Sequence, residues 1–120
     1  MRRVRQETLI AAPDAVTRWR IASGGSVQRS TDGGVTWEIQ DTGAAVTLTA
    51  GVSLSPSVCW FVGPGGIVVI TTDGRSWERL SFPEVVDLVA IRAADDKTAT
   101  VTAADGRRFT TINRGQTWVR

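Results

Sequence analysis

Histidine and tyrosine are absent from the 120-residue chain, and cysteine occurs once, as Cys59. The missing histidine excludes the Ser-His-Asp triad, Cys-His pairs and zinc sites with histidine ligands. The single cysteine excludes an intrachain disulfide and cysteine-rich metal sites, and Cys59 is expected to be a small buried core residue. We therefore assign no catalytic residue and no metal ligand, and we expect no cofactor.

Long apolar runs are also missing, so no segment is predicted to span a membrane or to act as a signal peptide. The net charge is only +2. That charge is too small for the basic stripe of a nucleic-acid-binding protein. The arginines that raise this question are Arg2, Arg3, Arg5, Arg107 and Arg108. The basic N-terminal region is expected to be a solvated face, and an acidic partner is the alternative.

A short motif is present three times at a nearly fixed spacing. The sequence STDGGVTW ends at Trp37, TTDGRSW ends at Trp77, and TINRGQTW ends at Trp118. The tryptophans are 40 and 41 residues apart, and the similarity continues upstream of each motif. A repeat of this length is typical of one supersecondary unit, which buries its apolar face only by stacking on its neighbours.

Each repeat is expected to form four short strands, because runs of β-branched and apolar residues alternate with Gly, Pro, Asp and Ser clusters. No segment shows a helical period, so almost no helix is expected. A four-stranded antiparallel unit of about 40 residues is typical of a β-propeller blade. The prediction is an all-β domain over residues 1–120, with three blades at about 4–41, 42–82 and 83–120.

The repeated motif is interpreted as a structural turn between the third and fourth strands of each blade. An aspartate such as Asp32 accepts hydrogen bonds from the turn, a glycine such as Gly34 permits positive φ, and the tryptophan covers the turn. We call residues 30–37, 71–77 and 111–118 the first, second and third box. The residues assigned this role are Ser30, Asp32, Gly34, Thr36, Trp37, Thr71, Asp73, Gly74, Ser76, Trp77, Thr111, Asn113, Gly115, Thr117 and Trp118.

The first box matches S-x-D-x-G-x-T-W and so resembles the Asp-box, or bacterial neuraminidase repeat. The longer phrases SGGSVQRSTDGGVTWE and WFVGPGGIVVITTDGRSWERL resemble the blades of photosystem II assembly and stability factor-like propellers. This resemblance implies a non-catalytic binding or assembly module with a protein client, and it implies an extracytoplasmic location.

Two other functions were considered. Sialidases also carry Asp-boxes, but they use a tyrosine nucleophile, and this chain has no tyrosine. In a carbohydrate-binding propeller, Trp19 and Trp60, at the same position in successive repeats, would be candidate stacking platforms. We expect these two residues to pack between blades instead, with any ligand pocket near the ring axis, beside the first strands.

Three blades are fewer than the four to eight of a closed propeller. The two end faces are expected to be apolar and to require a cover. We therefore expect a homodimer that closes a six-bladed ring. The alternatives are a segment of a longer propeller, a larger ring and a non-propeller arrangement.

Overall fold

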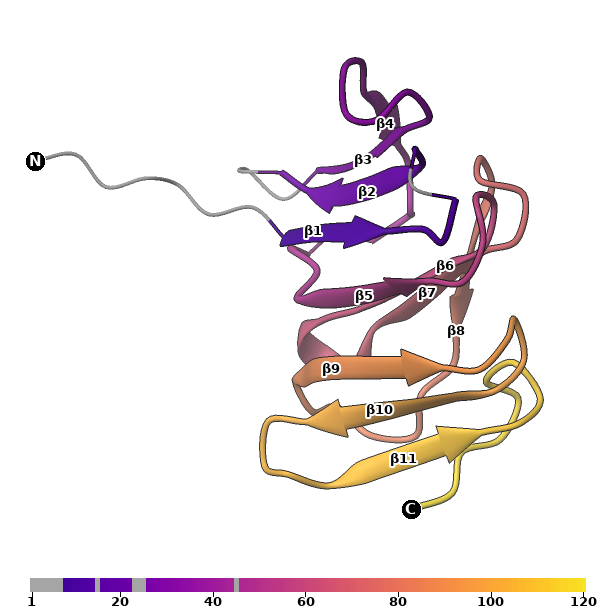
Figure 1. Ribbon diagram of the computed structural model, residues 1–120. Helices are drawn as coiled ribbons and strands as arrows, with labels where there is room; N and C mark the ends of the chain where they lie inside the picture. Colours follow the sequence, from indigo (N-terminus) through magenta and orange to yellow (C-terminus); the bar gives the residue numbers. More distant parts are fainter. Residues whose placement is uncertain (1–7, 15, 23–25, 45) are drawn as a thin grey trace, which may run out of the picture.

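The computed structural model describes residues 8–14, 16–22, 26–44 and 46–120 and contains three antiparallel sheets, stacked in chain order (Figure 1). Consecutive strands are hydrogen-bonded neighbours, so each sheet is a meander. The N-terminal sheet is β1–β4, the central sheet β5–β8 and the C-terminal sheet β9–β11. The strands are β1 (Thr8–Ala11), β2 (Arg18–Ile21), β3 (Val27–Ser30), β4 (Glu38–Gln40), β5 (Ala50–Ser53), β6 (Cys59–Val62), β7 (Val68–Thr71), β8 (Trp77–Leu80), β9 (Leu88–Ala93), β10 (Ala99–Ala103) and β11 (Arg108–Thr111).

The central sheet is covered on both faces, which explains why its two middle strands are apolar at nearly every position. Successive side chains of a strand point to opposite faces. Phe61 therefore packs into a core shared with the N-terminal sheet, and Trp60 into a core shared with the C-terminal sheet. Cys59 is fully buried, as predicted, and its burial raises the pKa of the thiol. Both cores are thus built around one sheet.

The two outer sheets are covered on one face only, and their strands alternate accordingly. In β2, Trp19 and Ile21 are buried against the central sheet, while Arg18 and Arg20 face away. In β10, Ala99, Val101 and Ala103 are buried and the intervening threonines face away. This is the period of two that a half-covered strand requires.

The outward faces of the two end sheets do not match the expectation of apolar surfaces. Cross-strand register places Leu9, Arg20, Gln28 and Ile39 in one row across the N-terminal sheet. On the C-terminal sheet the corresponding row runs through Arg92, Thr100 and Thr110, and a second row contains Thr102 and Arg108. The expectation was wrong because a strand with one uncovered face places polar side chains there. Apolar side chains such as Leu9 and Ile39, 58% and 75% exposed, are a minority.

The C-terminal sheet departs from the predicted four strands. It has three strands among the described residues, and the fourth is reduced to a single bridge between Thr110 and Val119. The prediction of four-stranded units therefore holds for the N-terminal and central sheets.

Helix is limited, among the described residues, to one 3-10 turn, η1 (Pro64–Gly66), as the lack of a helical period predicts. Gly65 and Gly66 both have positive φ there, and a Cβ on Gly66 would meet the carbonyl oxygen of Glu84. No helix in the described part of the chain is long and apolar enough to cross a membrane. Residues 23–25, one of the glycine-containing clusters expected to separate two strands, lie outside the described residues, as do Arg2, Arg3 and Arg5.

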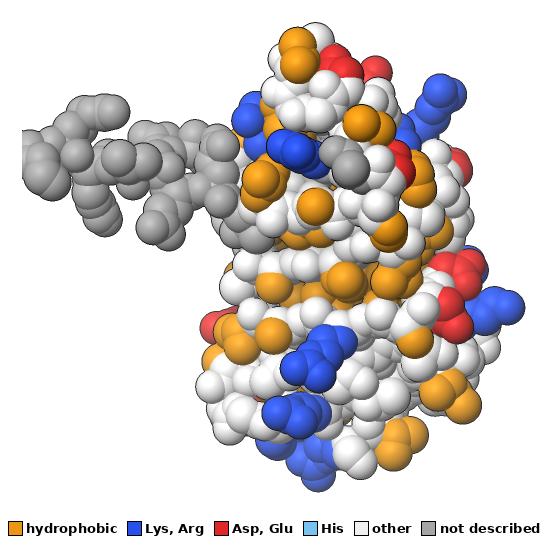
Figure 2. All heavy atoms as spheres, in the orientation of Figure 1, with side chains coloured by type: hydrophobic (Ala, Val, Ile, Leu, Met, Phe, Trp, Pro, Cys, Tyr) orange, Lys and Arg blue, Asp and Glu red, His pale blue; other side chains and the backbone are white. Residues whose placement is uncertain are grey.

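The first strands of the three sheets, β1, β5 and β9, lie side by side along one side of the stack (Figure 1). Figure 2 shows hydrophobic side chains gathered in a band across the middle of this side, with Lys and Arg side chains above and below. Ala50 and Val52 of β5 are only partly buried and pack against the core of the central and C-terminal sheets. The side of the stack formed by β1, β5 and β9 is thus apolar at its centre and basic toward its ends.

Candidate functional site

The first box is a compact turn organised around one carboxylate. Oδ1 of Asp32 accepts hydrogen bonds from the backbone N–H groups of Val35 and Thr36 at 3.0 and 2.9 Å, and the Thr36 hydroxyl donates to Oδ2. The Ser30 hydroxyl donates to Asp32 at 2.8 Å and accepts from the Gly34 N–H at 2.9 Å. These donors, the Thr36 hydroxyl foremost, lower the pKa of Asp32 to about 2.

The second box repeats this arrangement, although its turn is one residue shorter than that of the first box. Oδ1 of Asp73 accepts from the N–H groups of Arg75 and Ser76 at 2.8 and 2.7 Å, and Ser76 Oγ donates to Oδ2 at 3.0 Å. Thr71 takes the place of serine and accepts from Gly74 N–H at 3.0 Å. The two backbone donors hold the pKa of Asp73 far below its usual range.

The third box uses an amide where the first two use a carboxylate. Asn113 Oδ1 accepts from Thr117 N–H at 2.9 Å, and its Nδ2 donates to the Thr117 hydroxyl at 2.8 Å. Thr111 accepts from Gly115 N–H at 2.8 Å. The turn keeps part of the hydrogen-bond pattern, since the Gln116 N–H turns to the carbonyl oxygen of Asn113 at 3.3 Å, and it has no carboxylate at this position.

The box tryptophans face the preceding sheet. Trp77 donates to Gln40 Oε1 at 3.0 Å, and Trp118 donates to the carbonyl oxygen of Ser81 at 2.9 Å. Trp37 has no described sheet before it, and its indole N–H donates to the Gly34 carbonyl oxygen of its own turn at 3.1 Å. Two of the three tryptophans therefore join sheets, and the third closes only its own turn.

The candidate stacking residues, Trp19 and Trp60, are both fully buried. Trp19 donates to Ser53 Oγ at 2.9 Å, and Trp60 donates to Asp95 O at 3.2 Å, so both reach into the following sheet. Because neither indole presents a face to solvent, neither offers a stacking platform for a sugar.

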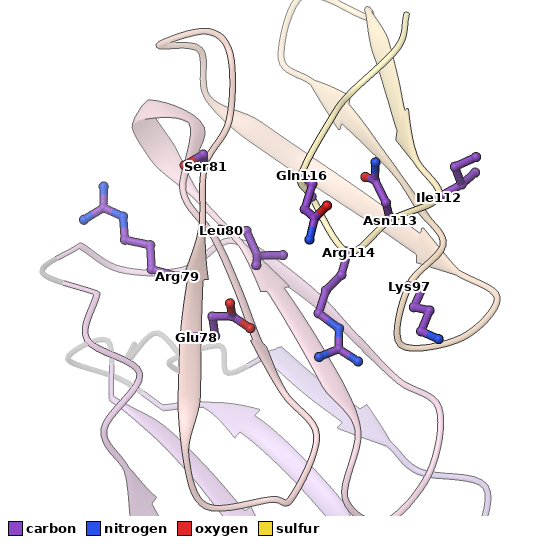
Figure 3. Close-up of a pocket in the computed structure, with 10 residues that line it drawn as sticks. Glu78, Arg79, Leu80, Ser81, Lys97, Ile112, Asn113, Arg114 and Gln116 are labelled. Carbon is purple, nitrogen blue, oxygen red and sulfur yellow. The ribbon is translucent and has the colours of Figure 1, made fainter.

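A groove of about 750 Å³ opens between β8 and the third box. One wall is residues 78–81, and the other is Lys97 with residues 112–116. Figure 3 shows Glu78 and Leu80 pointing toward the third box and Arg79 pointing away from it. This groove lies at the outer strand of the central sheet, away from the first strands where a ligand pocket was expected.

Arg114 lies on the box wall of the groove and is held by the neighbouring turn. Its Nε donates to Asp96 O at 2.9 Å, and one terminal nitrogen contacts Asp96 Oδ2 at 2.6 Å. Its backbone N–H donates to Lys97 O at 2.9 Å. Arg114 has φ 55°, the only positive value of a non-glycine residue in the described part of the chain.

A protein-family model described as "Photosynthesis system II assembly factor YCF48" matches residues 8–120. The chain belongs to this family. "Photosystem II stability/assembly factor HCF136, chloroplastic" from Arabidopsis thaliana is 30% identical over 95 residues, covering 72% of this chain and 24% of that protein. The resemblance to photosystem II assembly and stability factors is therefore confirmed, and the chain spans about a quarter of this curated relative.

Two solved structures of YCF48 are similar to this member of the family. "YCF48 bound to D1 peptide" superposes with a TM-score of 0.79 at 21% identity, covering 92% of this chain and 37% of that one. "YCF48 from Cyanidioschyzon merolae" gives 0.76 at 19% identity, covering 93% and 38%. The likeness shows that the three sheets adopt a propeller-type fold.

The three boxes were predictable from the sequence, and the groove beside the third box was not. Arg114 stands where the first box has Gly33, and this substitution was the available signal. Nothing in the sequence pointed to Lys97 or Glu78 as groove residues. Each is a single charged residue at a predicted strand end or turn, where charged side chains are common. Within the described residues, no group of three or more Cys, Asp or Glu side chains is placed to hold a metal ion. The groove combines charged and polar side chains with the apolar Leu80 and Ile112.

Proposed function

We propose that this chain is a non-catalytic protein-binding module of the assembly-factor type, which recognises a segment of a client protein. Family membership over residues 8–120 carries the proposal. The related YCF48 structure was solved with a D1 peptide bound, which supports a peptide as the ligand. The absence of histidine and tyrosine from the sequence removes the most common general base and the sialidase nucleophile.

A direct binding measurement tests this function. A fluorescein-labelled D1 peptide is titrated with the purified chain, and anisotropy is recorded against a scrambled peptide of the same composition. Saturable binding of the D1 peptide alone is expected. Equal binding of both peptides, or no saturation with either, would overturn the proposal.

The lectin alternative receives no support from the two tryptophans that raised it. Both indoles are buried and hydrogen-bonded within the protein. The protein-binding function is therefore favoured, and a glycan array with no bound sugar is the expected result.

We also propose that each sheet is one propeller blade, with bounds at about 4–41, 42–82 and 83–120, and that a second copy closes a six-bladed ring. In such a ring the C-terminal sheet of one copy would meet the N-terminal sheet of the other. Arg92 and Arg108 would then approach Arg18 and Arg20, and like charges repel across an interface. We expect self-association to be weak at low ionic strength and stronger in salt, which screens the repulsion.

Light scattering across a range of protein and salt concentrations measures this association. A mass that rises to that of a dimer with salt supports closure by a second copy. A monomer under all conditions would show that the end faces do not pair with each other.

A further inference from the structure

The groove beside β8 follows the edge of a strand. Four consecutive residues of this segment, 78–81, line it. Successive side chains of a strand point to opposite faces, so a hollow that touches four in a row runs along the backbone edge. β8 is the last strand of the central sheet, with β7 on one side and no described strand on the other. Its outer N–H and C=O groups are thus placed to pair with an added strand.

The opposite wall has two basic side chains, Arg114 and Lys97, beside two carboxylates: Asp96 is ion-paired with Arg114, and Asp95 lies near enough to Lys97 for that charge to help lower its pKa. Arg114 uses Nε and one terminal nitrogen on Asp96, which leaves further N–H donors of its guanidinium. Lys97 is exposed and has no ion pair within the described residues. Glu78, on the strand wall, is the opposing acidic group that lines the groove. A carboxylate entering on this side would meet the exposed Lys97 and the N–H donors of Arg114 that Asp96 does not use.

The backbone of Arg114 adds to this argument. A left-handed conformation is unfavourable for a residue with a Cβ, and glycine avoids that cost. Gly33 fills the corresponding position of the first box with φ 79°. At Arg114 the protein tolerates the strain and gains a guanidinium on the groove wall. Strained residues of this kind gather at binding sites.

We propose that this groove binds an extended peptide that pairs with β8 as an added strand and directs an acidic side chain toward Arg114 and Lys97. Main-chain hydrogen bonds to β8 supply affinity, as in other cases of strand addition, and the charge pair supplies selectivity. Glu78 disfavours a second acidic residue near the strand wall. This inference rests on the proposed protein-binding function and names the site and ligand class for it.

The probes are two fluorescein-labelled peptides, one of alternating Val and Glu and one of alternating Val and Lys. The Val-Glu peptide is expected to bind and the Val-Lys peptide to bind at least about tenfold more weakly. Arg114→Gly keeps a residue suited to positive φ, and it is expected to weaken Val-Glu binding about tenfold. Glu78→Gln is expected to tighten it. Arg75→Ala is the matched control. It removes one positive charge, as Arg114→Gly does, but from the second box, and it should leave binding unchanged.

A second pair of measurements separates strand addition from charge alone. Methylation of alternate backbone nitrogens in the Val-Glu peptide is expected to abolish binding, because it removes donors to the β8 edge. Equal binding of the methylated peptide would overturn strand addition.

The outcomes distinguish this inference from the function on which it rests. If the D1 peptide binds and Arg114→Gly leaves both D1 and Val-Glu binding unchanged, the groove is not the site, while the protein-binding function stands. If no peptide binds the wild-type chain, the proposed function itself fails. Circular dichroism and thermal unfolding of each variant establish that the loss of binding is not a loss of fold.

Discussion

At the junction between the N-terminal and central sheets, Arg29 of β3 lies close to Gly74 of the second box and donates to Pro56 O at 2.5 Å. At the junction between the central and C-terminal sheets, a guanidinium also binds the equivalent turn carbonyl, since Asp96 lies 40 residues after Pro56. There the guanidinium comes from Arg114 of the box itself. The repeat thus keeps the contact while changing the residue that makes it.

Whether a groove forms at a junction depends on which residue supplies the guanidinium. Cross-strand register pairs Trp19 with Arg29 in the first junction and Trp60 with Ile70 in the second. Arg29 extends from the core to the box and fills the space between them. Ile70 is short and stays in the core, where it is 1% exposed. The outer part of the second junction is therefore left open, and it is bordered by Arg114.

The largest effect is expected from removing the buried tryptophan of either junction. Trp19→Ala and Trp60→Ala each leave a large cavity and an unpaired acceptor in the neighbouring sheet, and each should lower the free energy of unfolding by about 3–5 kcal/mol. Urea unfolding followed by fluorescence measures both. A loss below about 1 kcal/mol for one of them would mean that this junction does not hold its sheets together.

The next contrast is between a box tryptophan inside a junction and one at the end of the stack. Trp77 packs edge-on against Trp19, with ring centroids 5.7 Å apart, and contacts Phe61 at the same distance. Trp37 contacts Arg20, whose guanidinium lies 4.1 Å from its ring centroid. Trp77→Ala should cost about 3 kcal/mol and Trp37→Ala about 1 kcal/mol.

The same unfolding assay tests this contrast. Equal losses for the two variants would indicate that Trp37 is covered by another sheet in solution, as ring closure by a second copy requires. Repeating the assay at several protein concentrations identifies such a cover, because stability supplied by a second copy depends on concentration.

The two guanidinium positions should differ more modestly. Arg29→Ala removes a side chain that covers Trp19 and fills the first junction, so a loss of about 1–2 kcal/mol is expected. Arg114→Gly loses an ion pair whose side chains are about one third exposed. It also relieves the left-handed backbone, and the two effects should nearly cancel, to within about 1 kcal/mol. A large loss for Arg114→Gly would show that its link to Asp96 is essential to the fold.

Much of the fold was predictable because each repeat of the sequence corresponds to one sheet of the structure. The three motifs at a 40-residue spacing located the turns, and alternating apolar residues located the strands around them. The polar end faces were not anticipated, because the sequence pattern was treated as if every sheet had two covered faces. Alternation in β2, where Arg18 and Arg20 flank Trp19, already distinguished a half-covered sheet from the continuously apolar β6.

The groove was harder to predict, since it arises from the space that a short side chain leaves. Ile70 in place of an arginine is an ordinary core substitution when a strand is considered alone. Its consequence appears only when β7, β8 and the third box are placed together. The arginine at a left-handed position of the third box was the one local clue, and its interpretation required the neighbouring Asp96.

The smallest expected effect is a difference in acid sensitivity between the first two boxes, which contain a carboxylate, and the third box, which contains an amide. The pKa of Asp32 in the folded protein is about 2, below the usual value of 3.8, and the pKa of Asp73 is lower still. The stabilisation from these carboxylates is therefore present above about pH 4 and is lost as the pH falls toward about pH 2. Asn113 does not titrate, so the third box contributes nothing to this loss.

Asp32→Asn combined with Asp73→Asn converts the first two boxes to the chemistry of the third. The decrease in Tm between about pH 5 and pH 2 should be smaller in this double variant than in the wild type. It should not vanish, because hydrogen bonds also lower the pKa values of Asp14, Asp95 and Asp105. Glu38→Gln, which removes an exposed carboxylate outside the boxes, is the control. Equal decreases in the double variant and the wild type would show that the boxes are not where the acid sensitivity of the fold resides.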